Sequence, residues 1–290
     1  MKQVRTDSRR FAVGIVSFIL ALQIFFAGNL LHAGQKEEKP LWELGIAGIS
    51  GYVADYPAAE TNHPKGIILP YVVYRGEIFR AGERGIARGR IFHNDRVEFD
   101  LSLGGSFDTE SDEDGVRHGM PDLDYLFEIG PRLQVILSKK GKNEKVEFEL
   151  PARAVMSTDF SSVSNEGLLI APSISWQHAD FQGTGAELKV SFGPIFASED
   201  FMDYFYEVAP RFATPQRPAF DAKSGYHGCE TAVRTLKKIQ DDLALFGTIE
   251  LGYYGGAANH DSPLFRQDLN VNVRIGFMWT PFHSRKSVQE

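Results

Sequence analysis

Apolar and polar residues alternate with a period of two over long stretches, and this pattern constrains the fold more than any other feature of the chain. In the segment 96–104, the apolar positions are Val97, Phe99, Leu101 and Leu103, and the residues between them are polar or glycine. The same alternation recurs in four further segments, at 125–137, 145–154, 187–196 and 271–279. Because successive side chains of a β-strand point to opposite faces, the pattern predicts strands with one apolar and one polar face.

Segment length and the position of aromatic residues favour a membrane barrel over a soluble sandwich. The segments run for about 10–13 residues, whereas a soluble strand averages about 5–6 and a tilted spanning strand needs about 9–11. Aromatic residues of the apolar face often fall near segment ends, where a barrel has its interfacial girdle. They are Tyr125, Phe127, Phe148, Trp176, Phe196, Tyr253, Phe277 and Trp279. The sequence therefore predicts an all-β fold, a transmembrane antiparallel up-and-down β-barrel, with a soluble β protein as the alternative.

We expect about twelve strands, an even number as in single-chain bacterial barrels. They are 41–52, 66–74, 78–82, 86–92, 95–105, 123–138, 145–156, 167–178, 185–196, 226–238, 243–254 and 270–279. The assignment treats 197–225 as one long loop that could fold over the barrel mouth, and 226–238 also allows a helix. Connections on one side are short, and those on the other side are long (53–65, 106–122, 157–166, 197–225 and 255–269). This asymmetry is typical of outer-membrane barrels, whose short turns face the periplasm.

The N-terminal residues 1–33 read as a cleavable signal peptide. Four basic residues, Lys2, Arg5, Arg9 and Arg10, precede an apolar run from Phe11 to Gly28, and the cut is expected after Ala33. An uncleaved membrane anchor is the alternative. The exported part, 34–290, then forms the barrel within 41–279 and ends in a C-terminal tail, 280–290. We expect it in the outer membrane of a Gram-negative cell, surrounded by lipid and lipopolysaccharide.

Charge and cysteine content exclude two classes of protein. The formal net charge of −7 leaves no basic excess for a nucleic-acid partner. The single cysteine, Cys229, excludes a disulfide framework.

A set of short motifs follows in a fixed order along the chain. Their characteristic residues are Asp55, Tyr56, Pro57, Pro70, Tyr74, Gly119, Asp122, Gly130, Tyr204, Phe205, Gly225, Asp261, Ser262 and Pro263. Each motif is weak alone, but together they resemble the MipA/OmpV family of MltA-interacting outer-membrane proteins over nearly the whole exported part. The chain departs from the family at its C-terminus, where a tail follows the terminal aromatic residue, Trp279 or Phe282. The segment Arg234–Lys238 is also more basic than a usual spanning strand.

The resemblance implies a non-enzymatic outer-membrane barrel without a cofactor. One branch of the family is regarded as a scaffold that joins a lytic murein transglycosylase to a bifunctional murein synthase, and other members are porin-like or adhesin-like. We therefore expect a scaffold for cell-envelope partners, with a passive channel for small solutes as the alternative.

Residue types that could support catalysis or metal binding occur without the required arrangement. His260, Asp261 and Ser262 are adjacent in sequence, so they cannot point at one another as a catalytic triad does. His118, His227 and His260 lack the spacing of a metal site. The acidic loop 108–114 lacks a calcium-loop pattern, because the twelfth position from Glu110 is Pro121.

The polar face of the strands carries charges of both signs, which we expect inside the barrel. They include Glu98, Asp100, Glu128, Arg132, Glu147, Arg153 and Arg274, with Arg96, Lys145 and Glu149 beside them. Opposite charges on neighbouring strands should pair, and mixed signs argue against a strongly ion-selective pore. The basic turn Lys139–Lys145 would face the periplasm, where it could contact an acidic partner.

Overall fold

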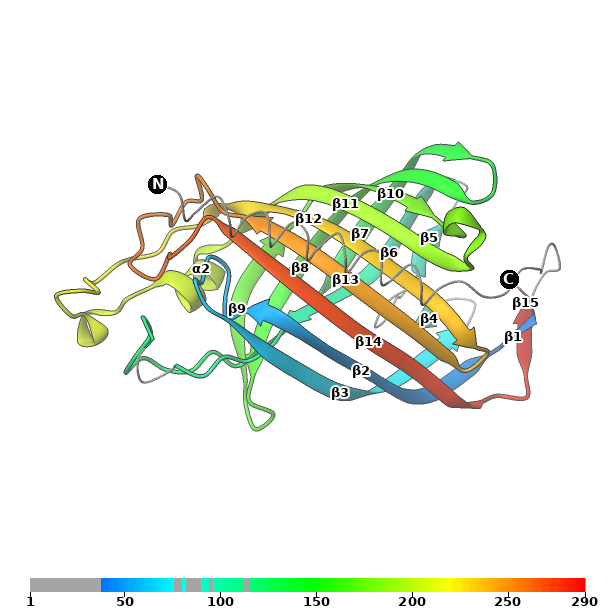
Figure 1. Cartoon of the computed structure of the whole chain (residues 1–290), viewed down its shortest axis with the longest axis horizontal. Coiled ribbons are helices and arrows are strands. Elements are labelled where there is room, and N and C mark those ends of the chain that lie inside the picture. Colours follow the sequence, from blue (N-terminus) through cyan, green and yellow to red (C-terminus); the bar gives the residue numbers. More distant parts are fainter. Residues whose placement is uncertain (1–37, 76–79, 82–89, 94–95, 112–114, 290) are drawn as a thin grey trace, which may run out of the picture.

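A computed structural model describes residues 38–75, 80–81, 90–93, 96–111 and 115–289 of the chain. The predicted signal peptide, 1–33, lies outside the described residues. Long, strongly tilted antiparallel strands wind around a common axis and form a barrel (Figure 1). Of the helices in the described residues, none is long and apolar enough to cross a bilayer.

Thirteen strands of the described residues form the main sheet. They are β2 (Trp42–Ala54), β3 (Asn62–Arg75), β4 (Arg80–Ala81), β5 (Arg90–His93), β6 (Val97–Ser106), β7 (Tyr125–Lys140), β8 (Glu144–Thr158), β9 (Val163–Ile170), β10 (Ser173–His178), β11 (Ala186–Ala197), β12 (Gly225–Gln240), β13 (Leu243–Tyr253) and β14 (Leu269–His283). The segment 226–238 thus lies within strand β12, so the helical alternative is wrong.

Most strands pair with their neighbour in sequence, and the last long strand pairs with the first. The register of β14 on β2 runs from Val273 opposite Tyr52 to His283 opposite Glu43. From there the sheet continues through β3 to β4 on one side and through β13 to β5 on the other. This pairing joins the N-terminal and C-terminal parts of the chain into one sheet, whose described edges are β4 and β5.

The long-loop ends of β3 and β6 are also joined by hydrogen bonds. Lys65 of β3 donates from Nζ to the carbonyl oxygen of Asp108 and to Oγ1 of Thr109, just beyond β6. Thr109 in turn donates from Oγ1 to the carbonyl oxygen of Asp55 at 2.6 Å. The loops after β2 and β6 therefore bridge the two sides of the described sheet.

The expected strand 167–178 is wrong as a single element. It consists of β9 and β10, which lie end to end between β8 and β11 and are separated by Ala171 and Pro172. Pro172 has no N–H group to donate to a ladder, and its carbonyl oxygen approaches Gly193 of β11 so closely that a Cβ atom there would clash. The proline thus divides one position of the wall into two strands.

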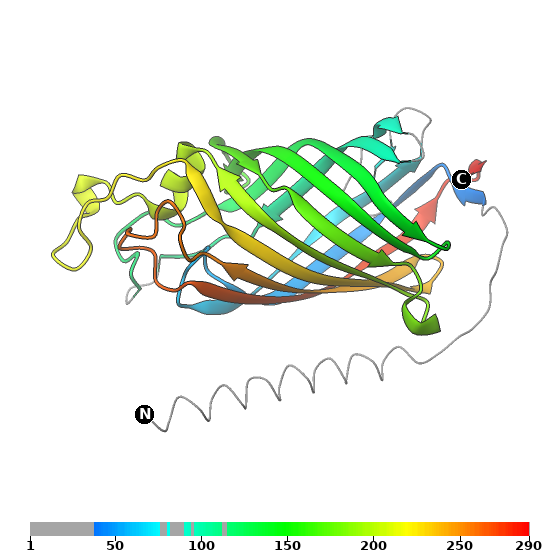
Figure 2. The ribbon, with the colours of Figure 1, turned by 90° about the horizontal axis from the view of Figure 1, so that it is seen from above.

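The connections at the two ends of the barrel differ in length as predicted. Those at one end span only 141–143, 179–185 and 241–242, and those at the other include 107–124, 198–224 and 254–268. The described ends of the chain meet at the short-turn end, where β1 (Glu38–Pro40) pairs with β15 (Ser287–Gln289) (Figure 2). The barrel does not stop at residue 279, because β14 continues to His283 and the tail then forms this small sheet.

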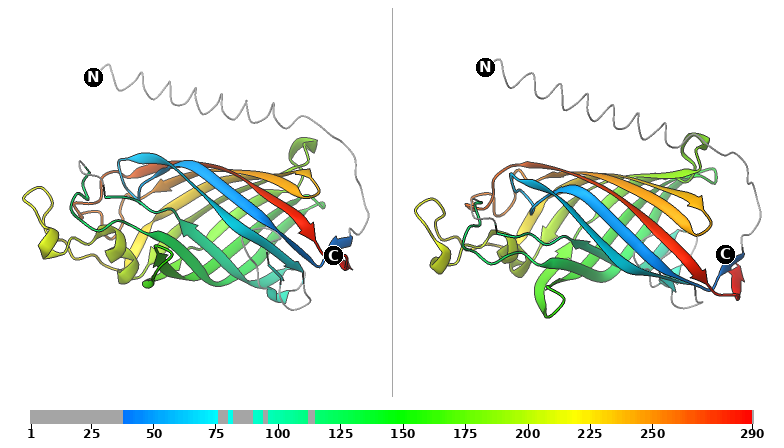
Figure 3. Two further views of the ribbon diagram at one scale, coloured as in Figure 1. Left: turned by 90° about the horizontal axis from the view of Figure 1, so that it is seen from below. Right: turned by 60° about the horizontal axis from the view of Figure 1, so that its bottom comes forward.

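The segment 197–225 contains a helix that the sequence analysis missed. After β11, α2 (Glu199–Tyr206) is followed by an isolated bridge between Val208 and Phe220 and by the 3₁₀ turn η2 (Pro210–Phe212). A second 3₁₀ turn, η1 (Phe181–Gly183), lies in the β10–β11 connection. Figure 3 shows α2 at the end of the barrel where the long loops gather.

Candidate functional site

Large apolar side chains point outward along the barrel wall, and strand β2 has an exposed aromatic residue near each of its ends. On β2, Trp42, Leu44, Ile46 and Tyr52 are exposed at alternate positions. Trp42 lies at the short-turn end and Tyr52 at the long-loop end. Their separation of ten positions spans about 33 Å along a strand, which a tilt of about 40° reduces to the ~25 Å of a bilayer-facing band.

All three tryptophans lie near the short-turn end, and two of them hydrogen bond to acidic residues of the adjacent turns. Trp176 donates from Nε1 to Oε1 of Glu144 at 2.9 Å. Trp279 donates from Nε1 to Oδ2 of Asp242 at 3.1 Å. At the opposite end, exposed aromatics include Tyr52, Phe127, Phe196 and Tyr253. A ring that is apolar on one side and hydrogen bonded on the other suits a membrane–water interface.

The inward face carries an ion-pair network that crosses five strands. Arg132 of β7 holds Asp100 of β6 in a bidentate pair, with Nε–Oδ1 and Nη2–Oδ2 distances of 2.9 and 2.6 Å. Its Nη1 atom lies 3.5 Å from Oε2 of Glu149 on β8, which also binds Ser175 of β10 and Lys189 of β11. Asp100 is fully buried, so this carboxylate depends on its pairing for compensation.

The other predicted interior charges lie in smaller groups. Arg153 contacts Glu128 at 2.8 Å and Ser102 at 3.0 Å. Glu147 pairs with Lys145 at 2.7 Å. Arg274 pairs with Glu250, which lies 3.8 Å from Arg234. Glu98 lies two positions from Asp100 on β6 and therefore on the same face. Paired charges of both signs thus occupy the interior.

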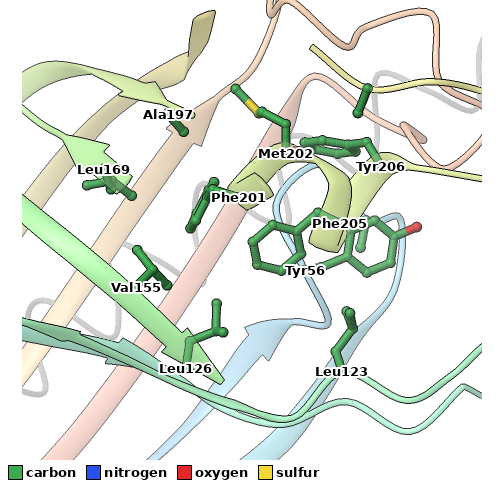
Figure 4. Close-up of a cluster of buried hydrophobic side chains, with 12 residues drawn as sticks. Tyr56, Leu123, Leu126, Val155, Leu169, Ala197, Phe201, Met202, Phe205 and Tyr206 are labelled. Carbon is green, nitrogen blue, oxygen red and sulfur yellow. The ribbon is translucent and has the colours of Figure 1, made fainter. Parts of the chain in front are cut away.

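Helix α2 packs apolar side chains into the long-loop end of the barrel. Phe201, Met202, Phe205 and Tyr206 are all buried and pack into a core cluster with loop and strand residues (Figure 4). The other members of this cluster are Tyr56, Ala59, Leu123, Leu126, Val155, Leu169, Ala197 and Ala222. Outside α2, the members come from three loops and four strands, so the helix lies between the loops and the barrel interior. We call α2 with this core cluster the stopper.

Hydrogen bonds between α2 and three loops hold the second half of the helix. Tyr206 donates from its hydroxyl to the carbonyl oxygen of Pro57 at 3.0 Å, and Tyr204 donates to that of Asp124 at 2.9 Å. Ser262 donates from Oγ to the carbonyl oxygen of Tyr206 at 2.7 Å. Burial raises the pKa of the Tyr204 and Tyr206 hydroxyls well above the usual value, so both remain protonated donors.

Five of the motif residues converge on this stopper, although they lie far apart in sequence. Tyr56, Pro57, Tyr204, Phe205 and Ser262 contact it directly or form part of it. Asp55, the residue before Tyr56, accepts hydrogen bonds from Thr61 at 2.5 Å and contacts His63 at 2.8 Å, which shapes the β2–β3 loop. The stopper is therefore where the motifs meet.

The remaining motif residues lie in loops or in strands of the barrel wall. Asp122 accepts a hydrogen bond from the backbone of Ser111 at 2.6 Å, and Gly119 has a φ of +76°, which favours glycine. Gly225 begins β12, and Asp261 and Pro263 lie in the β13–β14 loop. Three residues stay in the wall and do not join the stopper: Pro70 and Tyr74 on β3, and Gly130 on β7.

In the described part of the chain, Ser262 and the histidines considered above make separate contacts. Ser262 is buried and uses its hydroxyl on the backbone of Tyr206, whereas His260 points from Nε2 to Asp268 at 3.2 Å. His227 is buried among the rings of Phe201, Tyr206 and Tyr254, and His118 is exposed. Within the described part of the chain, no group of three or more His, Cys, Asp or Glu residues is arranged to hold a metal ion. Part of the acidic loop, 112–114, lies outside that part.

Sequence reasoning missed most of the stopper's apolar residues. Met202 is fully buried, and Leu264, also fully buried, accepts a hydrogen bond from Tyr56 at 2.8 Å through its carbonyl oxygen. The available signal was the spacing of Phe201, Met202, Phe205 and Tyr206, which lie on one face of a helix.

An apolar wall between two aromatic girdles, a paired polar interior and long loops at one end define a β-barrel of the outer-membrane type. Within that class, the chain belongs to the MipA family: the family model described as MltA-interacting protein MipA matches residues 44–281. This confirms the resemblance inferred from the motifs. No curated protein matches the sequence significantly.

Three solved structures that resemble this chain share little sequence with it. The outer-membrane phospholipase dimer of Salmonella typhi with bound calcium has 10% identity and a TM-score of 0.36, covering 88% of this chain and 96% of that one. The monoaromatic hydrocarbon channel CymD has 9% identity and a TM-score of 0.30, covering 84% and 68%. A FadL homologue of Pseudomonas aeruginosa has 13% identity and a TM-score of 0.28, covering 86% and 64%. At TM-scores this low, the likeness carries no argument about activity.

Proposed function

We propose that this chain is a closed outer-membrane scaffold that holds a murein-modifying enzyme at its periplasmic end and catalyses no reaction itself. The observation that carries the proposal is the α2 stopper, which fills the long-loop end of the barrel with buried side chains. A barrel filled in this way is better suited to binding partners than to passing solutes. The family description, MltA-interacting protein, supports a lytic transglycosylase as the partner, and a murein synthase joins it in the scaffold role that we expect.

The short-turn end is the docking end in this proposal. It faces the periplasm if the long loops face outward, as outer-membrane barrels have them. The basic turn Lys139–Lys145 lies beyond Trp176, because Trp176 is opposite Val146 and the strand then turns. Lys140 has 85% of its side chain exposed, and Glu144 is engaged by the indole of Trp176. The turn therefore offers positive charge to an acidic protein surface.

A passive channel fits these observations less well than a scaffold. Solutes would have to pass the stopper, whose helix is fixed by hydrogen bonds from Tyr206 and Ser262. They would then meet an interior in which the two carboxylates of Asp100 and Glu149 are balanced by Arg132 and Lys189. Such an interior offers a solute few uncompensated charges.

Catalysis by the barrel is not part of the proposal. A hydrolase of the Ser–His–Asp type needs a serine that donates to its base, whereas Ser262 donates to a backbone carbonyl group. Purified barrel should leave labelled phospholipid intact. Hydrolysis that is abolished by Ser262→Ala would overturn this part of the proposal.

Site-specific photocrosslinking in intact cells tests the scaffold role. A photoreactive amino acid at position 142, in the basic turn, should capture a murein transglycosylase or synthase. The same amino acid at position 216, in the long loop before β12, is the matched control and should capture neither. Absence of murein enzymes from the adducts at position 142, in cells that contain the folded barrel, would contradict the proposal.

The membrane assignment is tested by gel mobility. A folded barrel resists detergent until it is boiled, so protein from an outer-membrane fraction should migrate differently before and after heating. A chain that stays soluble and monomeric without detergent would contradict the assignment.

A further inference from the structure

A small cavity lies between α2 and β9, on the face of the helix opposite its buried residues. Its volume is about 320 Å³, and its lining consists of Asn165, Glu166, Asp200, Asp203, Tyr204 and Glu207. Asp200, Asp203 and Glu207 follow one another at helical spacing, and Glu166 comes from the facing strand. Helix α2 therefore has an apolar face that packs in the core cluster and an acidic face that lines this cavity.

The titratable groups around this cavity are predominantly acidic. Glu199 and Asp221 act on Asp203 in addition to the lining carboxylates, and Asp124 acts on Glu166. Among the described residues, none of the four lining carboxylates has a Lys, Arg or His nitrogen within 4.0 Å. Glu166 accepts a hydrogen bond from Ser157 at 2.7 Å. The cation that acts on Tyr204 is Arg117, which donates to the carbonyl oxygens of Phe205 and Pro121.

Negative charges held together without counter-cations repel one another, and a proton relieves that repulsion. Partial burial and, next, the carboxylates of Glu207, Glu199, Asp221 and Asp200 raise the pKa of Asp203 to about 6. If α2 separated from β9, the pKa of Asp203 would return towards its ordinary value of 3.8. At a pH between 3.8 and about 6, packing of α2 against β9 is therefore accompanied by protonation of Asp203. The packed helix is favoured at the acidic end of this pH range and is weakened as the pH rises through it.

We propose that the contact between α2 and β9 is a pH-sensitive latch, which holds the stopper more firmly in a mildly acidic medium than in a neutral one. The buried face of the helix keeps it seated at both pH values, and the carboxylates set how often it opens. The latch lies at the long-loop end and operates independently of partner docking at the other end. Its failure and the failure of the scaffold proposal are therefore distinguishable.

Hydrogen exchange of the purified chain in detergent micelles tests the latch. The measured quantity is the protection factor of amides in 199–206, which is the intrinsic exchange rate at each pH divided by the observed rate. We expect it to be about tenfold higher near pH 5 than near pH 7.5, because opening is linked to proton release. Peptides from β13 should show no such change.

Two variants locate the effect. Asp203→Asn is nearly isosteric and should flatten the pH dependence of the protection factor in 199–206. Asp261→Asn removes an exposed carboxylate of another loop at the same end and should leave the dependence intact; heat-modifiable mobility verifies that both variants are folded. Equal protection at the two pH values, a change in the opposite direction, or a wild-type dependence in Asp203→Asn would each overturn the proposal.

Discussion

Gly167 of β9 packs directly against Ser198, the residue that precedes α2. A Cβ atom on Gly167 would collide with Oγ of Ser198 and would lie 3.0 Å from Cβ of Asp200. The same Ser198 oxygen accepts a hydrogen bond from the backbone of Leu168 at 2.9 Å. Gly167 also has a φ of +88°, which side chains other than glycine rarely adopt. The start of the stopper thus depends on the absence of a side chain at this position.

Gly167→Ala should displace the start of α2 from β9. We expect the protection factors of amides in 199–206 to fall at least about tenfold, because the new methyl group and the positive φ both oppose the seated arrangement. The matched control is Gly141→Ala, which has a φ of +65° but nothing within 4 Å of the added Cβ. If both variants lower the protection equally, the contact with α2 is not the cause.

Phe205→Ala should weaken the stopper by removing a buried ring. Phe205 is 4% exposed and packs in the core cluster, so we expect a loss of about 3–5 kcal/mol in the free energy of local unfolding. Hydrogen exchange of α2 measures this loss. Phe160→Ala removes a ring that is 64% exposed and should change the α2 protection little. An effect of Phe160→Ala as large as that of Phe205→Ala would contradict the assignment of the core.

Arg132→Gln should destabilise the barrel wall by removing the guanidinium group that binds the buried Asp100 through two hydrogen bonds. Breaking one side of a buried ion pair costs about 3–5 kcal/mol. Urea unfolding in detergent, followed by gel mobility, measures the change. Lys140→Gln alters an exposed lysine whose distance to Glu144 is 3.9 Å, so it should cost less than about 1 kcal/mol. Equal stabilities of wild type and Arg132→Gln would show that the interior network does not contribute.

Trp176→Phe tests the interfacial role of the short-turn tryptophans. The phenyl ring keeps the apolar contact but cannot donate to Glu144, so we expect a loss of about 1 kcal/mol in unfolding free energy. Trp176→Phe combined with Glu144→Gln should add little further loss, because the hydrogen bond is already absent. A double variant whose losses are fully additive would contradict the pairing of Trp176 with Glu144.

The strands were predictable because their side chains have to satisfy lipid on one face and a polar interior on the other. The expected segment 95–105 corresponds to β6, and 243–254 corresponds to β13. Pairing of Arg132 with Asp100 followed from opposite charges on one face of neighbouring strands. These features depend only on a period of two, which local sequence carries.

The stopper was not predictable in the same way, because it depends on contacts between distant loops. Tyr206 meets Pro57 across 149 positions, and Ser262 meets Tyr206 across 56. The motif residues were identified, but their common location was not. The helix itself spans only eight residues, which is too short for a strong periodic signal. The break at Pro172 could have been predicted, because proline has no N–H group to donate to a neighbouring strand. The alternation of apolar and polar residues on both sides of Pro172 instead indicated one continuous strand.

Planar-bilayer conductance of the purified chain, measured near pH 5 where the latch is firmest, shows whether α2 closes the barrel. We expect no stable open steps for the wild type. Reproducible small steps should occur when residues 198–224, which contain α2, are replaced by a short glycine–serine linker. Stable steps of one size in the wild type, unchanged by removal of α2, would show that α2 does not close the barrel.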